Sequence, residues 1–494
     1  MLIASLVLLT LVLIASIFHK INIPVIILSL TIGIIFGSDV TGLIYFDNTV
    51  FAKEVANIAL MFILFIGGFG TKKQSFRSVL RPVSLLATVG IVTTALITGF
   101  VFHLLVPKVP LLYALLLGSI LASTDAAAVF SILKGKNVEP KLRTLTELES
   151  VANDPMAIVL TLFVIGLIQG AQSGILSSIL NFLWQLAGGI GIGIGIGWLA
   201  VYVMKKVRQS EAEYFIIYMI AVVLFSYSIA NVSRASGMLS VFFTGLVMGN
   251  QNIPYKKGLL SFNNIISFIT NVGLFILLGL LVFPHNFAKI WGNGILIFLI
   301  LSLVSRPITV FLLTWFCDIG LKEKTFLIAA GIKGSVPIVL ATYPSAMGLD
   351  PDHEIFNIVF FVVTLSVVIQ GTSLIPLARK LNLLVKDRRK TYKIVDLVTV
   401  TDTNFELVEV YIDEDFYEGS CRVADMELPP GTLITLVKRE GQVISPQGST
   451  EVFPRDILTI LVDKQYIEMI PIDILRSFVM KQLDNADRER ASEA

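Results

Sequence analysis

The chain has 494 residues, of which 55% are hydrophobic and only 15% are charged, and its formal net charge is +2. Soluble globular domains carry about 25% charged residues, so this composition excludes an ordinary soluble protein. It predicts a multi-pass membrane protein whose main partner is the lipid bilayer. We expect no nucleic acid polymer among its partners.

Apolar segments follow one another along the first 380 residues, and an α-helix needs about 17–25 apolar residues to cross a bilayer. We expect about thirteen transmembrane helices. The first segment lacks the basic start and the cleavage site of a signal peptide, so we interpret it as an uncleaved span. The predicted spans are 2–18, 22–37, 53–70, 82–106, 111–133, 145–169, 180–203, 214–231, 236–250, 260–283, 292–316, 325–345 and 354–379.

Lysine and arginine are concentrated in alternate loops, and loops rich in these residues stay in the cytoplasm. The loops on the opposite side contain only Lys53, Lys108, Arg234 and Lys289. We therefore expect the N-terminus outside and the C-terminus in the cytoplasm, as a multi-pass protein of a bacterial-type inner membrane.

The fifth span is interrupted by the sequence ASTDAAAVF at 122–130. Serine, threonine and aspartate compete with the backbone for hydrogen bonds and therefore favour a break in a helix. A break here would leave Thr124 and nearby carbonyl groups free to coordinate a cation, with Asp125 close by. Alternatively, Asp125 caps a half-helix, which is compatible with ion binding.

The sixth span begins with polar residues in the sequence ESVANDP. Ser150 and Asp154 are four residues apart and share a helix face, as do Glu149 and Asn153. Pro155 lacks a backbone donor and frees a carbonyl group one turn earlier. Such hard oxygen ligands suit an alkali cation or a proton, although Ser150 alone is equally consistent with polar contacts between helices. An ionisable group at membrane depth indicates function, so Asp154 is the central candidate.

Two further features exclude other chemistry. The sequence GGIGIGIGIGW at 188–198 lies inside a span and follows no strand, so it predicts close helix packing rather than dinucleotide binding. Cys317 and Cys421 form no CxxC pair, so we expect neither a metal site nor a disulfide framework.

Two cations lie at membrane depth in the later spans: Arg306 in SRPITV and Lys333 in GIKGSVPIVLATYP. Buried cations need anionic partners. Glu149 and Asp125 are the available anions, and we predict that Glu149 pairs with Lys333, with Arg306 as the alternative partner of Glu149. The glycines and proline around Lys333 also interrupt the twelfth span. Interrupted helices in the fifth and twelfth spans predict an inverted-repeat transporter with its site at the midplane.

The composition changes from mostly apolar to more polar after residue 384. The basic sequence KDRRKTYK that follows suits contact with anionic headgroups. We expect a transmembrane domain over 1–384, a basic linker over 385–394, a small cytoplasmic α+β domain over 395–470 and a charged tail over 471–494.

Within the small domain, alternating patterns predict strands at 405–412 and 456–463 and a hairpin turn at 439–442. The sequence SCRVADMEL between them predicts a short helix.

The order and spacing of STD, ESVANDP, RP, GIKGSVPIVLATYP and VVIQGTSL resemble the cation:proton antiporter superfamily, in particular its NhaP-type potassium/proton branch. The resemblance covers nearly the whole membrane part. It implies a NhaA/NapA-like fold with inverted repeats and discontinuous helices. It also implies a homodimer in which six-helix core domains move against a dimerisation domain, and a secondary transporter rather than an enzyme, without a cofactor.

The resemblance also assigns roles to single residues. Asp154 is similar to the aspartate that carries the cation and the proton, and Asn153 to the asparagine that precedes it in electroneutral members. Ser150, Asp125 and Thr124 match further ligands of a monovalent cation or their neighbours.

The chain departs from the family pattern at two positions. Glu149 matches a glutamate that pairs with an inner arginine, but Lys333 stands in that arginine's place, and lysine lacks the forked geometry. Ile66, in LFIGGFG, is neutral where relatives commonly have an acidic residue near the glycine pair.

The segment 428–463 resembles a TrkA C-terminal, or RCK-C, domain, with Arg455-Asp456 where many members have Gly-Asp. Such domains pair with each other and bind small regulatory ligands. The resemblance implies regulation by a cyclic dinucleotide or another nucleotide.

A single buried carboxylate predicts electroneutral exchange, because Asn153 provides no second carrier beside Asp154. The sequence does not rank potassium against sodium, so a sodium/proton antiporter is one alternative. An RCK-gated cation channel would need a carbonyl-lined filter, and an intramembrane aspartyl protease would need a GxGD signature; neither is present. A membrane sensor without transport is the remaining alternative.

Overall fold

The computed structural model describes residues 9–10, 13, 25–37, 39–71, 73–133, 137–170, 175–206, 211–282, 284–385, 392–395, 404–412, 419–467, 469–470 and 474. The chain divides into two compact units. The first comprises 1–209, 213–253 and 260–385, and the second comprises 386–494 with the short pieces 210–212 and 254–259.

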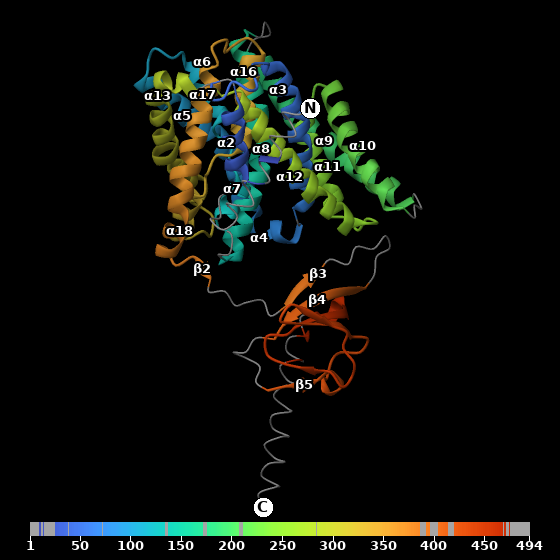
Figure 1. The fold of residues 1–494 in the computed structure, drawn as a ribbon. Helices are drawn as coiled ribbons and strands as arrows, with labels where there is room; N and C mark the ends of the chain where they lie inside the picture. Colours follow the sequence, from blue (N-terminus) through green and yellow to red (C-terminus); the bar gives the residue numbers. More distant parts are fainter. Residues whose placement is uncertain are drawn as a thin grey trace, which may run out of the picture. The chain divides into compact units, whose positions relative to one another are not determined.

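The first unit is built of helices, as its apolar segments predict (Figure 1). Two of its helices continue through π-helical turns, η3 (Ile300–Ser305) and η4 (Ser366–Gln370), a local widening that is frequent near functional sites. The helices are α2 (Val25–Phe36), α3 (Thr49–Gly70), α4 (Lys73–Ala87), α5 (Val89–Leu105), α6 (Leu111–Ile120), α7 (Ala126–Ile132), α8 (Pro140–Ile168), α9 (Ile175–Lys206), α10 (Ala212–Val232), α11 (Gly237–Gly249), α12 (Lys256–Leu280), α13 (Phe287–Leu299), α14 (Arg306–Leu313), α15 (Leu321–Ala329), α16 (Ser335–Ala346), α17 (Glu354–Leu365) and α18 (Gly371–Lys380).

In the described part of the chain, eight helical segments are long and apolar enough to cross a membrane. Shorter apolar helices, such as α6 and α11, account for further predicted spans. The first predicted span, 2–18, lies almost entirely outside the described residues. A multi-pass helical fold is therefore confirmed, and the count of thirteen spans stays a prediction.

The glycine-rich stretch of α9 packs tightly against α11, as its sequence predicts. A Cβ atom at Gly189 would lie 2.9 Å from the Ser236 carbonyl oxygen, and one at Gly193 would lie 2.3 Å from the Ser240 carbonyl oxygen. Only glycine permits this approach, so the stretch serves helix packing.

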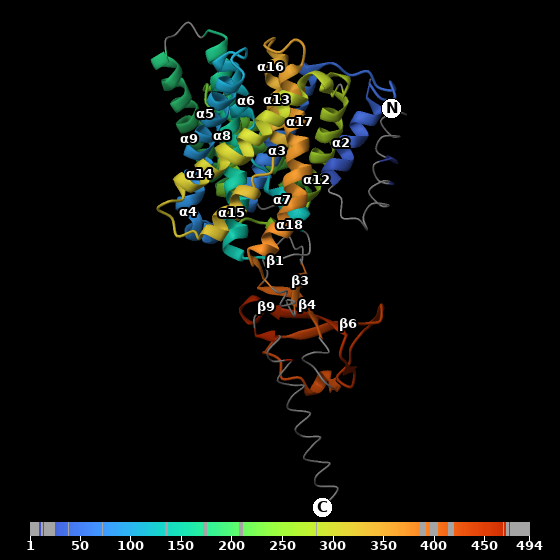
Figure 2. The ribbon, with the colours of Figure 1, turned by 90° about the vertical axis from the view of Figure 1, so that its left-hand side faces the viewer.

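The fifth and twelfth spans are both discontinuous, as predicted. Helices α6 and α16 lie toward one face of the unit, and α7 and α15 lie toward the other (Figure 2). The two breaks touch, because the Asp125 backbone N–H donates to the Ile332 carbonyl oxygen at 2.8 Å. A Cβ atom at Gly334 would lie 1.8 Å from Asp125 Oδ2, so glycine is required where the breaks cross.

A short strand pair lies where the last membrane helix ends. The strands β1 (Asn137–Val138) and β2 (Leu384–Val385) are antiparallel neighbours, and the Glu139 backbone N–H donates to the Leu383 carbonyl oxygen at 3.3 Å. Val138 and Leu383 are buried in a core shared by several helices. The pair therefore fastens the end of the membrane unit to the residues just before α8.

The second unit contains an antiparallel five-stranded sheet in the order β3-β4-β9-β6-β7, and β5 and β8 pair separately. The predicted turn joins β6 to β7, with positive φ at Glu440 and Gly441. The strands are β3 (Tyr392–Val395), β4 (Phe405–Tyr411), β5 (Cys421–Arg422), β6 (Leu433–Arg439), β7 (Gln442–Ile444), β8 (Glu451–Val452) and β9 (Ile457–Asp463).

Three details of the predicted C-terminal part are corrected. Strand β3 begins at Tyr392, inside the predicted linker 385–394, because it completes the sheet edge along β4. The buried side chain of Ile474 belongs to the core, although the sequence places it in the charged tail. The predicted short helix is a single 3₁₀ turn, Val423–Asp425. The rest of the tail after 470 lies outside the described residues.

An ion pair between the half-buried Arg439 and the buried Asp456 fixes the end of this sheet. Arg439 Nε and Nη2 donate to the two carboxylate oxygens of Asp456 at 2.9 and 2.8 Å, and Asp456 also accepts from the Phe453 backbone N–H. This bidentate contact raises the pKa of the Arg439 guanidinium above its ordinary value. Arg455 has a φ of 75°, in the left-handed region that favours glycine.

Candidate functional site

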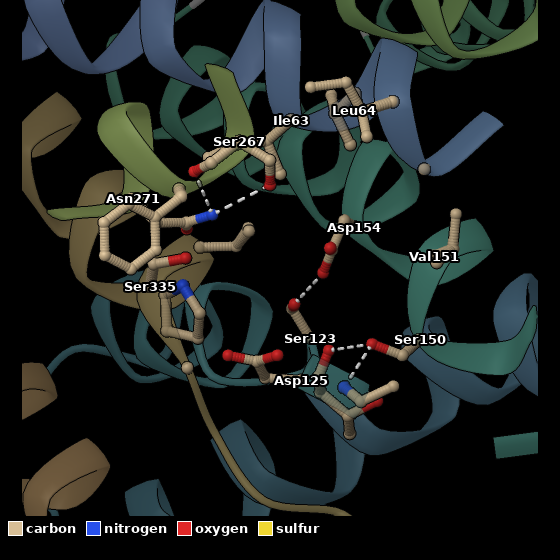
Figure 3. A pocket seen from close by; sticks show the side chains of 18 of the residues that line it. Ile63, Leu64, Ser123, Asp125, Ser150, Val151, Asp154, Ser267, Asn271 and Ser335 are labelled. Carbon is tan, nitrogen blue, oxygen red and sulfur yellow. Dashed lines mark hydrogen bonds between the residues drawn. The ribbon is translucent and has the colours of Figure 1, made fainter. Parts of the chain in front are cut away.

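Asp154 projects from the middle of α8 toward the break between α6 and α7 (Figure 3). The Ser123 hydroxyl in the break donates to Asp154 Oδ1 at 2.5 Å. Because the break ends the regular helix, its side chains and backbone groups can turn toward α8. The two predicted segments therefore meet at the carboxylate that the sequence singles out.

Ser150 and Asn153 fasten α8 to the same break. The Ser150 hydroxyl donates to the Thr124 carbonyl oxygen at 2.7 Å and accepts from the Ala126 backbone N–H at 2.8 Å. Asn153 Nδ2 donates to Thr124 Oγ1 at 2.7 Å. Asn153 and Ser150 therefore fix the geometry around Asp154, and Ser150 and Thr124 also line the cavity beside it.

Asp125 caps the half-helix α7, since its Oδ1 accepts from the Ala128 backbone N–H at 3.1 Å. Its side chain also lines the cavity next to Asp154. Capping satisfies a backbone donor that the break would otherwise leave unpaired. The residue thus stabilises the break and adds negative charge to the cavity.

Lys333 lies in the break between α15 and α16 and is only 1% exposed. Its Nζ donates to the carbonyl oxygens of Ser123 at 2.9 Å and Ala122 at 3.4 Å, just beyond the end of α6. The ammonium group therefore neutralises the negative end of a half-helix dipole.

The predicted pairing of Glu149 with Lys333 is wrong. Glu149 Oε1 lies 2.6 Å from Arg306 Nη1 in a buried ion pair, whose angles do not fit a hydrogen bond. Arg306 Nη2 also donates to the Leu327 carbonyl oxygen at 3.3 Å. Lys333 is unavailable for this pair because the carbonyl groups of the α6 break hold its ammonium group.

A hydrogen-bonded chain connects the Lys333 backbone to both π-helical turns. The Lys333 N–H donates to Ser366 Oγ at 3.0 Å, and the Ser366 hydroxyl donates to Gln370 Oε1 at 2.5 Å. Gln370 Nε2 then donates to Ser302 Oγ at 3.1 Å. Sequence patterns gave no sign of this support.

A cavity of about 420 Å³ opens beside Asp154, between α3, α8, α12, α16 and the α6–α7 break. Helix α3 contributes Ile63, Leu64 and Ile66, so no acidic group comes from the glycine-pair motif. Helix α12 contributes Ser267 and Asn271, with Asn271 Nδ2 donating to the Ser267 carbonyl oxygen at 2.8 Å (Figure 3).

The polar residues of α12 were missed by the sequence analysis. Asn264, Ser267 and Asn271 all line the cavity and are spaced at i, i+3 and i+7. This spacing places them on one helix face, and polar residues on one face of an apolar span are the signal that identifies them. Among the described residues, no cluster of histidine, cysteine and acidic side chains suits a resident metal ion.

Two crossed, interrupted helices around a carboxylate at membrane depth define a secondary transporter. Residues 6–380 match the family described as the transmembrane sodium/hydrogen exchanger, so the chain belongs to that family and is a cation/proton antiporter.

Known antiporters resemble the chain over most of its length. It is 32% identical over 462 residues to the K(+)/H(+) antiporter NhaP2 of Shewanella sp. (strain ANA-3), which covers 93% of this chain and 80% of the relative. It is 28% identical over 344 residues to the Na(+)/H(+) antiporter NhaH of Halobacillus aidingensis, covering 66% and 84% of the two chains.

Among solved structures, the sodium proton antiporter MjNhaP1 of Methanocaldococcus jannaschii superimposes with a TM-score of 0.67 at 25% identity. The match covers 76% of this chain and 97% of MjNhaP1. The match confirms that the membrane unit has an antiporter fold, as the sequence motifs predict.

Proposed function

We propose that the protein exchanges potassium for protons, one for one, by binding either ion at Asp154. The observation that carries this proposal is the Asp154 carboxylate, which lines the cavity from the middle of α8 and has the neutral Asn153 beside it. The cavity's other carboxylate belongs to Asp125. Asp125 is committed to capping α7. The names of the more similar relatives, which are K(+)/H(+) antiporters, favour potassium over sodium.

Competition for one anion couples the two ions. A bare carboxylate is costly at membrane depth, so a transporter with an empty site does not readily move that site from one side of the membrane to the other. A proton or a monovalent cation neutralises Asp154, and either loaded state can cross. Ser150 and the groups at Thr124 are the cation ligands in this proposal, while Ser267 and Asn271 face the ion across the cavity.

Exchange in proteoliposomes tests the proposed function. We expect potassium to drive proton movement more effectively than sodium or lithium, and an imposed membrane potential to leave the initial rate unchanged, because one positive charge moves each way. Potassium, sodium, rubidium and lithium should be compared at several pH values. Sodium-only exchange would support the sodium alternative, and cation flux without proton flux would indicate a channel.

We also propose that the protein is a homodimer in which the membrane units pair with each other and the C-terminal units pair with each other. The C-terminal unit is an RCK-C domain in this proposal and binds a small anionic ligand such as a cyclic dinucleotide. The β1–β2 pair supports a route from this unit to the ion site. The connecting segment starts directly after Val385, and β1 directly precedes the helix that carries Asp154. A ligand acts through this route only by binding two arrangements with different affinity.

A chain that ends after Lys386 should still exchange ions but lose its response to cyclic dinucleotides and to cytoplasmic pH. This truncation keeps β2 and the whole membrane unit. The matched variant is the full chain with a flexible Gly-Ser insertion between Val385 and Lys386, which should respond more weakly while exchanging normally. A folded truncation without transport would make the unit structural, and an unchanged response of the insertion variant would exclude this route.

A further inference from the structure

We call the cavity beside Asp154 the inner cavity. A second cavity lies next to it. The second cavity, the vestibule, has a volume of about 290 Å³ and is lined by Gly70, Thr144 and Glu147, among others. Only Gly67 and Val151 line both cavities. The vestibule and the inner cavity therefore lie on the two sides of one contact between α3 and α8.

The lining residues follow one face of each helix. On α8, Thr144, Glu147, Val151 and Asp154 are spaced at i, i+3, i+7 and i+10, which places them in one row. Glu147 and Asp154 are seven residues apart, or about 10 Å along the helix. On α3, the row runs in the opposite sense from the inner cavity to Gly70. The two rows outline a path from the N-terminal end of α8 to Asp154.

The path is narrowest where Gly67 meets Val151. A Cβ atom at Gly67 would lie 2.9 Å from Val151 Cγ1, so even one methyl group does not fit without movement. The next residue, Gly68, faces α11 instead, where a Cβ atom would lie 2.2 Å from the Phe242 carbonyl oxygen. The glycine pair thus holds α3 against α11 while bringing its other side close to α8.

Val151 has space on its other side. It also lines an apolar cavity of about 210 Å³ between α4, α8, α9 and α11, together with Leu148 and Met156. A valine in a helix is held to one side-chain rotamer, so the contact opens by a shift of α8 rather than by rotation of the side chain. The apolar cavity provides room for such a shift.

We propose that the Gly67–Val151 contact controls the passage of cations between the vestibule and Asp154. The ions concerned are hydrated monovalent cations, which must shed water at this contact before they reach the carboxylate. The proposal rests on the proposed role of Asp154 as the ion carrier, but its test has a separate readout. The basic residues before and at the N-terminal end of α8, among them Lys134, Lys136 and Lys141, predict that the vestibule faces the cytoplasm.

The experiment measures thiol accessibility in inside-out vesicles, using full-length chains in which the free cysteines are removed by Cys317→Ser and Cys421→Ser. A thiol introduced by Ile63→Cys reports on the inner cavity, and one introduced by Gly70→Cys reports on the vestibule. A membrane-impermeant methanethiosulfonate reagent is added to the cytoplasmic side, and modification rates are compared with rates of potassium-driven proton flux.

We expect Gly67→Ala to slow modification at position 63 by about tenfold, because the added methyl group overfills the contact, and to leave position 70 unaffected. Val151→Ala should speed modification at position 63, and the two substitutions together should restore the original rate. Gly166→Ala, on α8 with no atom within 4 Å of the added Cβ, should change neither rate.

A rate at position 63 that does not fall with Gly67→Ala, or does not recover when Val151→Ala is added, would overturn the proposal. Asp154→Asn separates this result from the proposed function. If modification follows the expected pattern while exchange persists without the carboxylate, the contact controls access but Asp154 is not the carrier.

Discussion

Replacing the central carboxylate by an amide, Asp154→Asn, should reduce cation-dependent proton flux to the background of empty liposomes. The amide has nearly the same volume and keeps an oxygen that can accept from the Ser123 hydroxyl. It neither binds a proton nor carries the negative charge that competing ions neutralise. The fold should therefore persist while both halves of the exchange are lost, as flux assays on the purified, monodisperse variant would reveal.

A matched control is available elsewhere in the membrane unit. Asp350 is a buried carboxylate that accepts from the backbone N–H groups of Ile355 and Phe356 at the start of α17. Asp350→Asn should lower the unfolding temperature without abolishing exchange per folded protein. If a well-folded Asp154→Asn protein still moves protons in response to potassium, the ion is carried elsewhere and the proposed site is wrong.

The two helix breaks were predictable because their cause is local. Serine, threonine and aspartate in ASTD, and glycine around Lys333, weaken helical hydrogen bonding wherever they occur. The hairpin turn at Glu440 and Gly441 follows from the same kind of local chemistry. Local chemistry therefore predicted the break around Thr124 and the polar start of the sixth span, whereas the resemblance to the antiporter superfamily joined them into one site.

Partner choice was not predictable, because it depends on which buried groups face one another. The sequence offered Lys333 and Arg306 to Glu149, and family position favoured Lys333. Lys333 is instead held by the carbonyl groups of Ala122 and Ser123, which accept hydrogen bonds from its ammonium group. The helix break between α6 and α7 thus determines which cation pairs with Glu149 on α8. No local sequence pattern encodes this choice.

The polar face of α12 and the π-helical turns escaped the sequence analysis for a related reason. Ser267 and Asn271 are unremarkable in isolation, and only their shared direction toward the inner cavity gives them a role. The predicted linker 385–394 includes the first three residues of strand β3 because the basic sequence KDRRKTYK suits contact with lipid headgroups, whereas pairing with β4 determines the structure of the strand.

Removing either partner of the buried pair of Glu149 and Arg306 should have a large effect on the stability of the fold rather than on transport. The two side chains are 2% and 8% exposed, so removal of either partner leaves an uncompensated charge. We expect Glu149→Gln or Arg306→Met alone to lower the free energy of unfolding by roughly 3–5 kcal/mol, by analogy with buried pairs in soluble proteins. Unfolding in mixed detergent micelles measures this loss.

The double variant distinguishes the two candidate cations. Glu149→Gln combined with Arg306→Met should be more stable than either single variant, because no lone charge remains buried. Glu149→Gln combined with Lys333→Met should show weaker coupling, since Lys333 has its own carbonyl partners. If the coupling energy were instead larger with Lys333, the ammonium group would be the effective partner of Glu149, and the close approach of Arg306 would add little to stability.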